Sequence, residues 1–290
     1  MSGRTERRLV VALTFDHDAL SSPVDRGEGP VLRSRGEFGP RVGVPRVLDL
    51  LRRHSIPATF FVPGHTAVTF PDSVRAIVDG GHEIACHGWA HEDLAALPVD
   101  GQRALLEHSR DTLAEAYVRA PVGFRAPYWS LGEETLQLVE EAGFTYDSSL
   151  MDDDVRLHRV RFGARHSRER SELGHDGDLV EVPVSWTLDD WPQFEPGRLG
   201  LGPMSAPSKV EEIWAAELRW AWEHEPGGVL TFTMHPEAIG RMSRIAMLER
   251  LIETAESLEG IVFDRLDTIV DHWAVANPRA ARDASAPARD

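Results

Sequence analysis

Segments with strand periodicity and segments with helix periodicity alternate along the 290-residue chain, and this alternation constrains its fold most. The first segment, 9–15, is continuously apolar and rich in β-branched residues, as is typical of a strand buried on both faces. Further strand-like segments lie at 58–62, 83–86, 123–125, 144–146, 179–183, 229–234 and 261–263. Helical spacing separates them, for example over 42–53 and 209–224. The pattern predicts an α/β fold: one domain with parallel strands, a distorted (β/α) barrel.

Some stretches interrupt this alternation. Residues 19–40 and 191–207 are rich in Gly and Pro, so we expect two long loops of the kind that often act as lids. Residues 151–178 are polar and show no clear period. The last residues, 278–290, are rich in Ala, Arg, Pro and Asp, so we predict a disordered tail after a single domain over 1–277.

Composition restricts the possible partners and location. The formal net charge of −16 argues against nucleic acid or an anionic membrane as the main partner. The single cysteine, Cys86, excludes an intramolecular disulfide. We see no signal peptide and no apolar stretch of membrane-spanning length, and therefore predict a cytoplasmic protein. A homo-oligomer is compatible with the sequence, which does not specify the oligomeric state.

Polar side chains that could carry chemistry follow several different strands. They are Asp16, His17 and Asp18 after the first strand, His87 and His91 after the third, Arg125 after the fourth, and His235 after the strand at 229–234. A barrel brings the C-terminal ends of its parallel strands to one face, so we expect these residues to meet there. Each could by itself be a capping or surface residue, and their shared position is the argument for a site.

The histidine pair is the most specific of these features. His87 and His91 are four residues apart, which would place them on one face of a helical turn, close enough to bind one ion. Imidazole suits zinc and other first-row metals, and a catalytic zinc site usually has three protein ligands. With an aspartate from the first strand, the pair predicts a hydrolytic metal site. The alternative is two surface histidines at an accidental spacing.

Four motifs, in this order, resemble those of the NodB-type polysaccharide deacetylases, carbohydrate esterase family 4. They are the segments 14–18, 87–91 and 125–129 and the strand that ends in His235. The likeness is greatest to a branch without signal peptides, which contains cyclic imidases, allantoinase-like enzymes and proteins called peptidoglycan deacetylases. In most members of the family the two aspartates are adjacent, whereas here His17 separates them.

The resemblance implies the metal ligands. Carried over to this chain, Asp18, His87 and His91 bind one divalent ion, with zinc preferred over manganese, cobalt or nickel. The ion would lower the pKa of a bound water and polarise the substrate carbonyl, so no serine or cysteine nucleophile is required. His17 is interpreted as a structural neighbour, with a ligand role left open.

The resemblance also implies the acid and the base. Asp16 would be the general base, held ionised by a guanidinium such as that of Arg125, and His235 would protonate the departing nitrogen. Arg125 could instead only fix a loop, and His235 could be a satisfied histidine at a strand end.

Five further residues are candidates for substrate binding. They are Tyr128, Trp129, Asp190, Trp191 and Glu37. The aromatic residues could form a pocket wall, although aromatics more often belong to a core. Asp190 belongs to the pair 189–190, where the resemblance places an aspartate that orients the catalytic histidine or arginine.

We therefore predict a metal-dependent hydrolase of non-peptide C–N bonds. Its substrate would be a small-molecule amide or an N-acetylated glycan. Ring opening of a small cyclic imide, amide or ureide is favoured, because no export signal is visible and the two long loops could cover the site. The alternative is an N-deacetylase of N-acetylglucosamine-containing polysaccharide or peptidoglycan. A third possibility, a non-catalytic metal- or sugar-binding protein, is disfavoured because Asp16 and His235 are both present.

Overall fold

The computed structural model describes residues 9–117, 119–195 and 204–278. Within these residues the main sheet contains β1 (Leu9–Asp16), β2 (Thr59–Val62), β3 (Glu83–Cys86), β4 (Gly123–Phe124), β5 (Tyr146–Asp147), β6 (His158–Phe162), β9 (His175–Glu181), β10 (Gly228–Met234) and β11 (Ile261–Phe263). A separate small hairpin pairs β7 (Arg165–His166) with β8 (Ser171–Glu172).

The helices follow the strands in alternation. They are α1 (Ser21–Asp25), α2 (Pro30–Phe38), the π-helical η1 (Gly39–Gly43), α3 (Val44–His54), α4 (Gly64–Thr69), α5 (Pro71–Asp79), η2 (Leu94–Ala96), α6 (Val99–Tyr117), η3 (Pro127–Trp129), α7 (Thr135–Glu141), η4 (Trp186–Leu188), α8 (Asp190–Phe194), α9 (Pro207–His224), α10 (Pro236–Ile239), α11 (Met242–Glu256) and α12 (Leu266–Ala276).

The sheet is curled and almost entirely parallel. Its strand order is β10-β1-β2-β3-β4-β5-β9-β6, with β11 beside the start of β1, and only β6 and β9 pair antiparallel. After β9 the chain returns to the other edge, where Asp189 forms a parallel bridge with Thr233 of β10. This curled, half-closed barrel confirms the predicted fold class.

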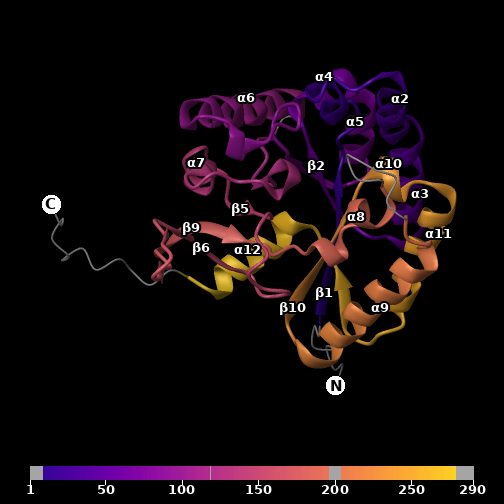
Figure 1. Ribbon diagram of the computed structural model, residues 1–290. Coiled ribbons are helices and arrows are strands. Elements are labelled where there is room, and N and C mark those ends of the chain that lie inside the picture. The colour runs from indigo at the N-terminus through magenta and orange to yellow at the C-terminus, as the bar shows by residue number, and fades with distance from the viewer. Residues whose placement is uncertain (1–8, 118, 196–203, 279–290) are drawn as a thin grey trace, which may run out of the picture.

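Strand β1 lies in the middle of the fold (Figure 1). All eight of its residues are buried, as the continuous apolar pattern predicts. One face, including Leu13 and Phe15, belongs to the large core under the outer helices. The other face, including Val10 and Ala12, packs in a second cluster with residues of α12. Because β1 is fixed from both sides, the polar residues at its C-terminal end have a rigid support.

The predicted loop at 19–40 is wrong, because this stretch contains α1 and α2 and leads into η1. Glycine disfavours a helix interior, and Gly36 lies inside α2. Gly36 is there because a β-carbon at this position would lie 2.3 Å from the carbonyl oxygen of Ala19. A long-range contact therefore overrides the local preference.

Other expectations changed in detail. The predicted loop at 191–207 begins with a helix, α8, and residues 196–203 lie outside the described part of the chain. The stretch 151–178 contains β6 and the β7–β8 hairpin. Helix α12 ends at Ala276, close to the predicted domain end, while most of the predicted tail lies outside the described residues. Among the helices that are described, none is long and apolar enough to cross a membrane.

Candidate active site

The histidine pair lies on a loop, and the predicted helical turn is wrong. Strand β3 ends at Cys86, and the backbone then takes positive φ angles of 68° at Gly88 and 69° at His91. The carboxylate of Glu92 accepts hydrogen bonds from the backbone N–H groups of Trp89 (3.2 Å) and Ala90 (2.9 Å), which fixes this turn. The loop nevertheless brings the two imidazole rings together, with centroids 5.1 Å apart.

Asp18, His87 and His91 form a compact group of possible metal ligands. Asp18 Oδ1 lies 3.6 Å from His87 Nε2, and Asp18 Oδ2 lies 3.2 Å from His91 Nε2. All three side chains are buried. Burial opposes ionisation of Asp18, but the neighbouring charges of His91 and His87 hold the pKa of Asp18 below its usual value.

The donor set fits a divalent ion. His87 Nδ1 lies 2.8 Å from the carbonyl oxygen of Arg125, and because a carbonyl can only accept, Nδ1 carries the proton and Nε2 keeps its lone pair. Burial also lowers the pKa of His87, which favours the neutral ring that binds metals. Asp18 Oδ1 is buried without a hydrogen-bond partner among the described residues, as expected of an oxygen reserved for an ion.

His17 does not belong to this group. Its Nε2 lies 3.1 Å from the hydroxyl of Ser73 in α5, and the side chain is fully buried. Burial lowers the pKa of His17 to about 4, so the ring is neutral at physiological pH. This geometry agrees with its interpretation as a structural neighbour.

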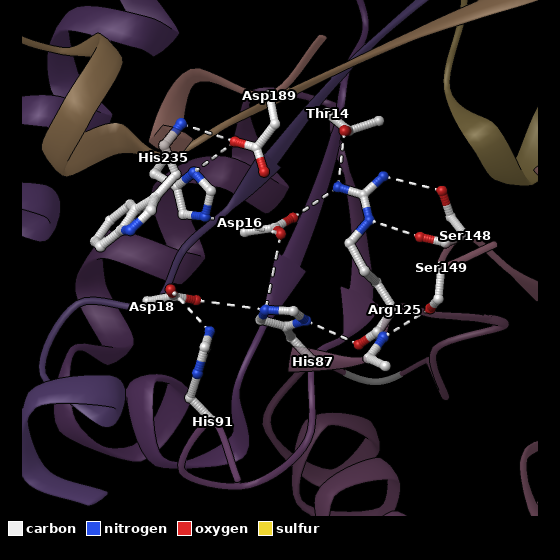
Figure 2. A network of polar contacts seen from close by, with 12 residues as sticks. Thr14, Asp16, Asp18, His87, His91, Arg125, Ser148, Ser149, Asp189 and His235 are labelled. Atoms are coloured by element: carbon white, nitrogen blue, oxygen red, sulfur yellow. Dashed lines mark hydrogen bonds and ion pairs between the residues drawn. The ribbon is translucent and has the colours of Figure 1, made fainter. Parts of the chain in front are cut away.

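Arg125 positions Asp16 (Figure 2). Its Nη1 donates to Asp16 Oδ1 at 2.7 Å and to the hydroxyl of Thr14 at 2.9 Å. Its Nε and Nη2 donate to the carbonyl and the hydroxyl of Ser148, and its guanidinium lies over the ring of Phe61. These contacts hold the fully buried Arg125 side chain in one conformation. Because Arg125 binds Asp16 Oδ1, the other oxygen, Oδ2, faces the histidines.

His235 faces Asp16 from the opposite side. Its Nε2 lies 4.0 Å from Asp16 Oδ2, which in turn lies 3.7 Å from His87 Nε2. His235 Nδ1 lies 2.8 Å from Asp190 Oδ1. Burial lowers the pKa of His235, but the hydrogen bond to Asp190 and the charges of Asp190, Asp189 and Asp16 outweigh burial and raise that pKa well above its usual value. The ring is therefore protonated near neutral pH and can act as an acid.

These groups open into one pocket, whose empty space is about 520 Å³ when the part open to solvent is included. It is lined by Asp16, Asp18, Ser22, Arg26, His87, His91, Ala126, Tyr128, Trp129, Trp186, Asp189, Trp191 and His235. The lining includes Tyr128, Trp129 and Trp191, for which we considered a position in a pocket wall. Asp190 contacts His235 and does not line the pocket. Glu37 does not line it either: it is half-buried and pairs with Arg41 at 3.2 Å.

Sequence reasoning missed several residues of the site. Ser22 and Arg26 come from the segment interpreted as a loop, and Trp186 lies on the short helix η4, next to the ring of Trp129. A buried carboxyl pair, Asp147 and Glu181, was missed as well. Both hold the segment that contains Ser148, the residue to which Arg125 donates. Asp147 accepts a hydrogen bond from the hydroxyl of Ser149, and Glu181 accepts from the backbone N–H groups of Ser149 and Leu150. The only sequence signal was two serines directly after a strand.

Known proteins resemble this chain in sequence and in fold. A family model described as polysaccharide deacetylase matches residues 3–146. A peptidoglycan deacetylase of Helicobacter pylori is 32% identical over 94% of this chain and 99% of its own length. The chain is a hydrolase of carbon–nitrogen bonds other than peptide bonds. It belongs to the polysaccharide deacetylase family.

Solved structures agree with this assignment. The structure of a Mycobacterium smegmatis protein assigned to the polysaccharide deacetylases has a TM-score of 0.83 and 36% identity, covering 99% of this chain and 97% of the other. An allantoinase has a TM-score of 0.80 and 24% identity, covering 96% and 94%, a likeness that shows the fold alone. Deacetylases of this family use a divalent metal, and the group formed by Asp18, His87 and His91 is suited to one.

Proposed function

We propose that this chain is a metal-dependent N-deacetylase of glycans that contain N-acetylglucosamine. The observation that carries the proposal is the arrangement of a ligand triad, a carboxylate and a protonated imidazole around one pocket. The name of the Helicobacter pylori relative supports a peptidoglycan-type substrate. It favours the alternative that sequence reasoning placed second.

Asp18, His87 and His91 would hold the ion, which we propose to be zinc because two imidazoles and a carboxylate are a common zinc donor set. When bound, the ion would make a water molecule more acidic and polarise the amide carbonyl. Cytoplasmic location and oligomer formation stay predictions.

Asp16 and His235 divide the proton transfers of amide hydrolysis. Asp16 Oδ2, directed by Arg125, would take a proton from the attacking water while the oxygen of that water forms a bond to the carbonyl carbon of the amide. His235 Nε2 would donate a proton to the amide nitrogen as the C–N bond breaks, so that the amine leaves neutral. The products are acetate and the free amino sugar. Asp190 keeps His235 charged and oriented for this role.

The ligand assignment is tested by metal content. Purified protein should hold about one ion per chain, and Asp18→Ala and His87→Ala should lose it, because each removes one of three ligands. His17→Gln is the matched control: it changes a buried histidine next to Asp18 that bonds to Ser73, and it should retain the ion. Full metal content in both ligand variants would refute the assignment.

The activity is tested by acetate release from chitooligosaccharides and peptidoglycan fragments with added zinc, manganese or cobalt. Asp16→Asn should keep the metal and lose turnover, since the amide cannot accept the proton. Wild-type protein that holds metal but releases no acetate from either substrate would contradict the proposal.

Ring opening of a small cyclic amide is the second candidate. Ser22 and Arg26, from α1 and its C-terminal end, line the pocket together with three aromatic residues, Tyr128, Trp129 and Trp191. Such walls suit a small ring, whereas a polymer needs an open groove. Succinimide, hydantoin, dihydrouracil and allantoin should be assayed beside the glycans. Ring opening without acetate release would establish this candidate in place of the deacetylase.

A further inference from the structure

Three polar side chains that contact one another line the pocket in addition to the proposed metal ligands, acid and base. Arg26 follows α1, with its Nη1 3.5 Å from the hydroxyl of Tyr128. That hydroxyl also interacts with the side chain of Ser22. All three residues line the pocket.

This cluster is held close to the reacting centre. The ring of Tyr128 stands edge-on to the ring of His91, with centroids 4.3 Å apart. One tyrosine ring therefore separates the guanidinium of Arg26 from a proposed metal ligand. Tyr128 has a φ of 59°, a left-handed conformation that non-glycine residues rarely adopt and that is often found at functional sites.

The start of α1 is fixed to the proposed metal ligand Asp18. The hydroxyl of Ser21 and that of Thr66 both donate to the carbonyl oxygen of Asp18, each at 2.7 Å. Ser22 and Arg26 follow directly on this anchored turn. Ser22 and Arg26 are therefore held in a fixed position relative to Asp18, and they line the same pocket as the three proposed ligands.

Arg26 is the single Lys or Arg among the described residues that line the pocket. Its Nη2 binds the carboxylate of Glu28 at 2.8 Å, while its buried Nε has no hydrogen-bond partner in the described part of the chain. A guanidinium has five N–H donors in a planar fork that matches a carboxylate. Glu28 and the hydroxyl of Tyr128 use only part of these donors, so donors remain for a second carboxylate.

We infer that Ser22, Arg26 and Tyr128 form a carboxylate subsite, so that the preferred substrate is an N-acetylated sugar that carries a carboxylate close to the scissile amide. This inference rests on the proposed deacetylase function. Arg26 would bind the acid group, with the two hydroxyls as further donors. A neutral N-acetyl sugar fills the same pocket but leaves Arg26 without this partner.

The test compares two probes that differ only in charge, N-acetylmuramic acid and its methyl ester, on the zinc-loaded full chain. The wild type should show a kcat/KM for the acid about tenfold or more above that for the ester, the size of one charge-assisted hydrogen bond. Arg26→Gln should bring this ratio to about one by raising KM for the acid, while Arg26→Lys should keep part of it.

Arg33→Gln is the matched control, because Arg33 is an exposed arginine of α2 outside the pocket lining, and it should keep the wild-type ratio. Equal use of acid and ester by the wild type, or an unchanged ratio in Arg26→Gln, would overturn the inference.

Binding measured by calorimetry separates this inference from the proposed function. If neither probe loses acetate, the deacetylase proposal fails for these sugars. Tighter binding of the acid than of the ester by the wild type, abolished in Arg26→Gln, would still support the subsite. Equal binding of both probes by the wild type would refute it, whatever the turnover.

Discussion

The charge of His235 depends on Asp190, and replacing this aspartate tests the proposed acid most directly. The Asp190→Asn variant keeps the shape of the fully buried side chain and an oxygen for the backbone N–H of His235, which lies 3.1 Å from Asp190 Oδ1. It removes the negative charge 2.8 Å from His235 Nδ1. Burial lowers the pKa of His235, and without the charge of Asp190 less remains to raise it, so the pKa of His235 should fall.

The size of the effect follows from this one contact. A hydrogen bond to a charged group contributes about 1.5–3 kcal/mol, which corresponds to a fall of about one to two in the pKa of His235. Because His235 would act in its protonated form, activity is lost as the pH rises through its pKa. The alkaline limb of the kcat/KM profile should therefore move to lower pH by about the same amount.

The assay is acetate release from chitooligosaccharides between pH 5 and pH 10 at saturating zinc, on protein with verified metal content. Asp189→Asn is the matched control, since Asp189 Oδ1 lies farther from His235 Nδ1, at 3.8 Å, and its removal should move the limb less. An alkaline limb that stays at the wild-type position in Asp190→Asn would refute His235 as the acid whose charge Asp190 maintains.

Three other predictions concern the supports of the site. Gly36→Ala should lower the free energy of unfolding, measured by urea denaturation, by about 1–3 kcal/mol, because the new methyl group would lie 2.3 Å from the carbonyl oxygen of Ala19. Gly29→Ala is the control and should change the free energy of unfolding little, since no atom lies within 4 Å of the new methyl group. Burial, and then the charge of Asp267, raise the pKa of Glu83 from 4.5 to about 7, so the fold favours the protonated form. The free energy of unfolding should therefore fall by about 3 kcal/mol as the pH rises from about 4.5 to above 7. Glu83→Gln should flatten that slope, and an unchanged slope would contradict the assignment. Arg125→Lys should retain metal but lower kcat about 100-fold, because an ammonium cannot reproduce the fork that directs Asp16; near-normal turnover would count against that role.

The alternation of strands and helices and the position of the polar residues at strand ends could be predicted from sequence because both depend on local patterns. The continuous apolar run of β1 has one interpretation, a strand covered on both faces, and its polar end must then lie at the edge where parallel strands place their chemistry. Asp16, Asp18, His87 and His235 came together for this reason.

What could not be predicted depends on contacts between distant segments. The four-residue spacing of His87 and His91 resembled a helical turn, whereas two positive φ angles in a loop produce the same proximity. Helix α2 has a glycine in its interior, and for that reason its sequence does not predict a helix. Arg26 was missed as well, because it follows the short helix α1, which was also not recognised, and a single pocket residue has no periodic signal of its own.

The central position of β1 has a consequence for how the chain folds. The ligand group lies within residues 18–91, and β1 pairs with its neighbour β2 through Thr14 and Thr59. On the other side, the hydroxyl of Thr14 donates to the carbonyl of Phe232, a partner 218 residues away. Contacts so distant in sequence form late, because a long loop must close first. A refolding chain should therefore gain the ability to capture an ion before β10 docks and delivers His235, so that ion uptake precedes recovery of turnover.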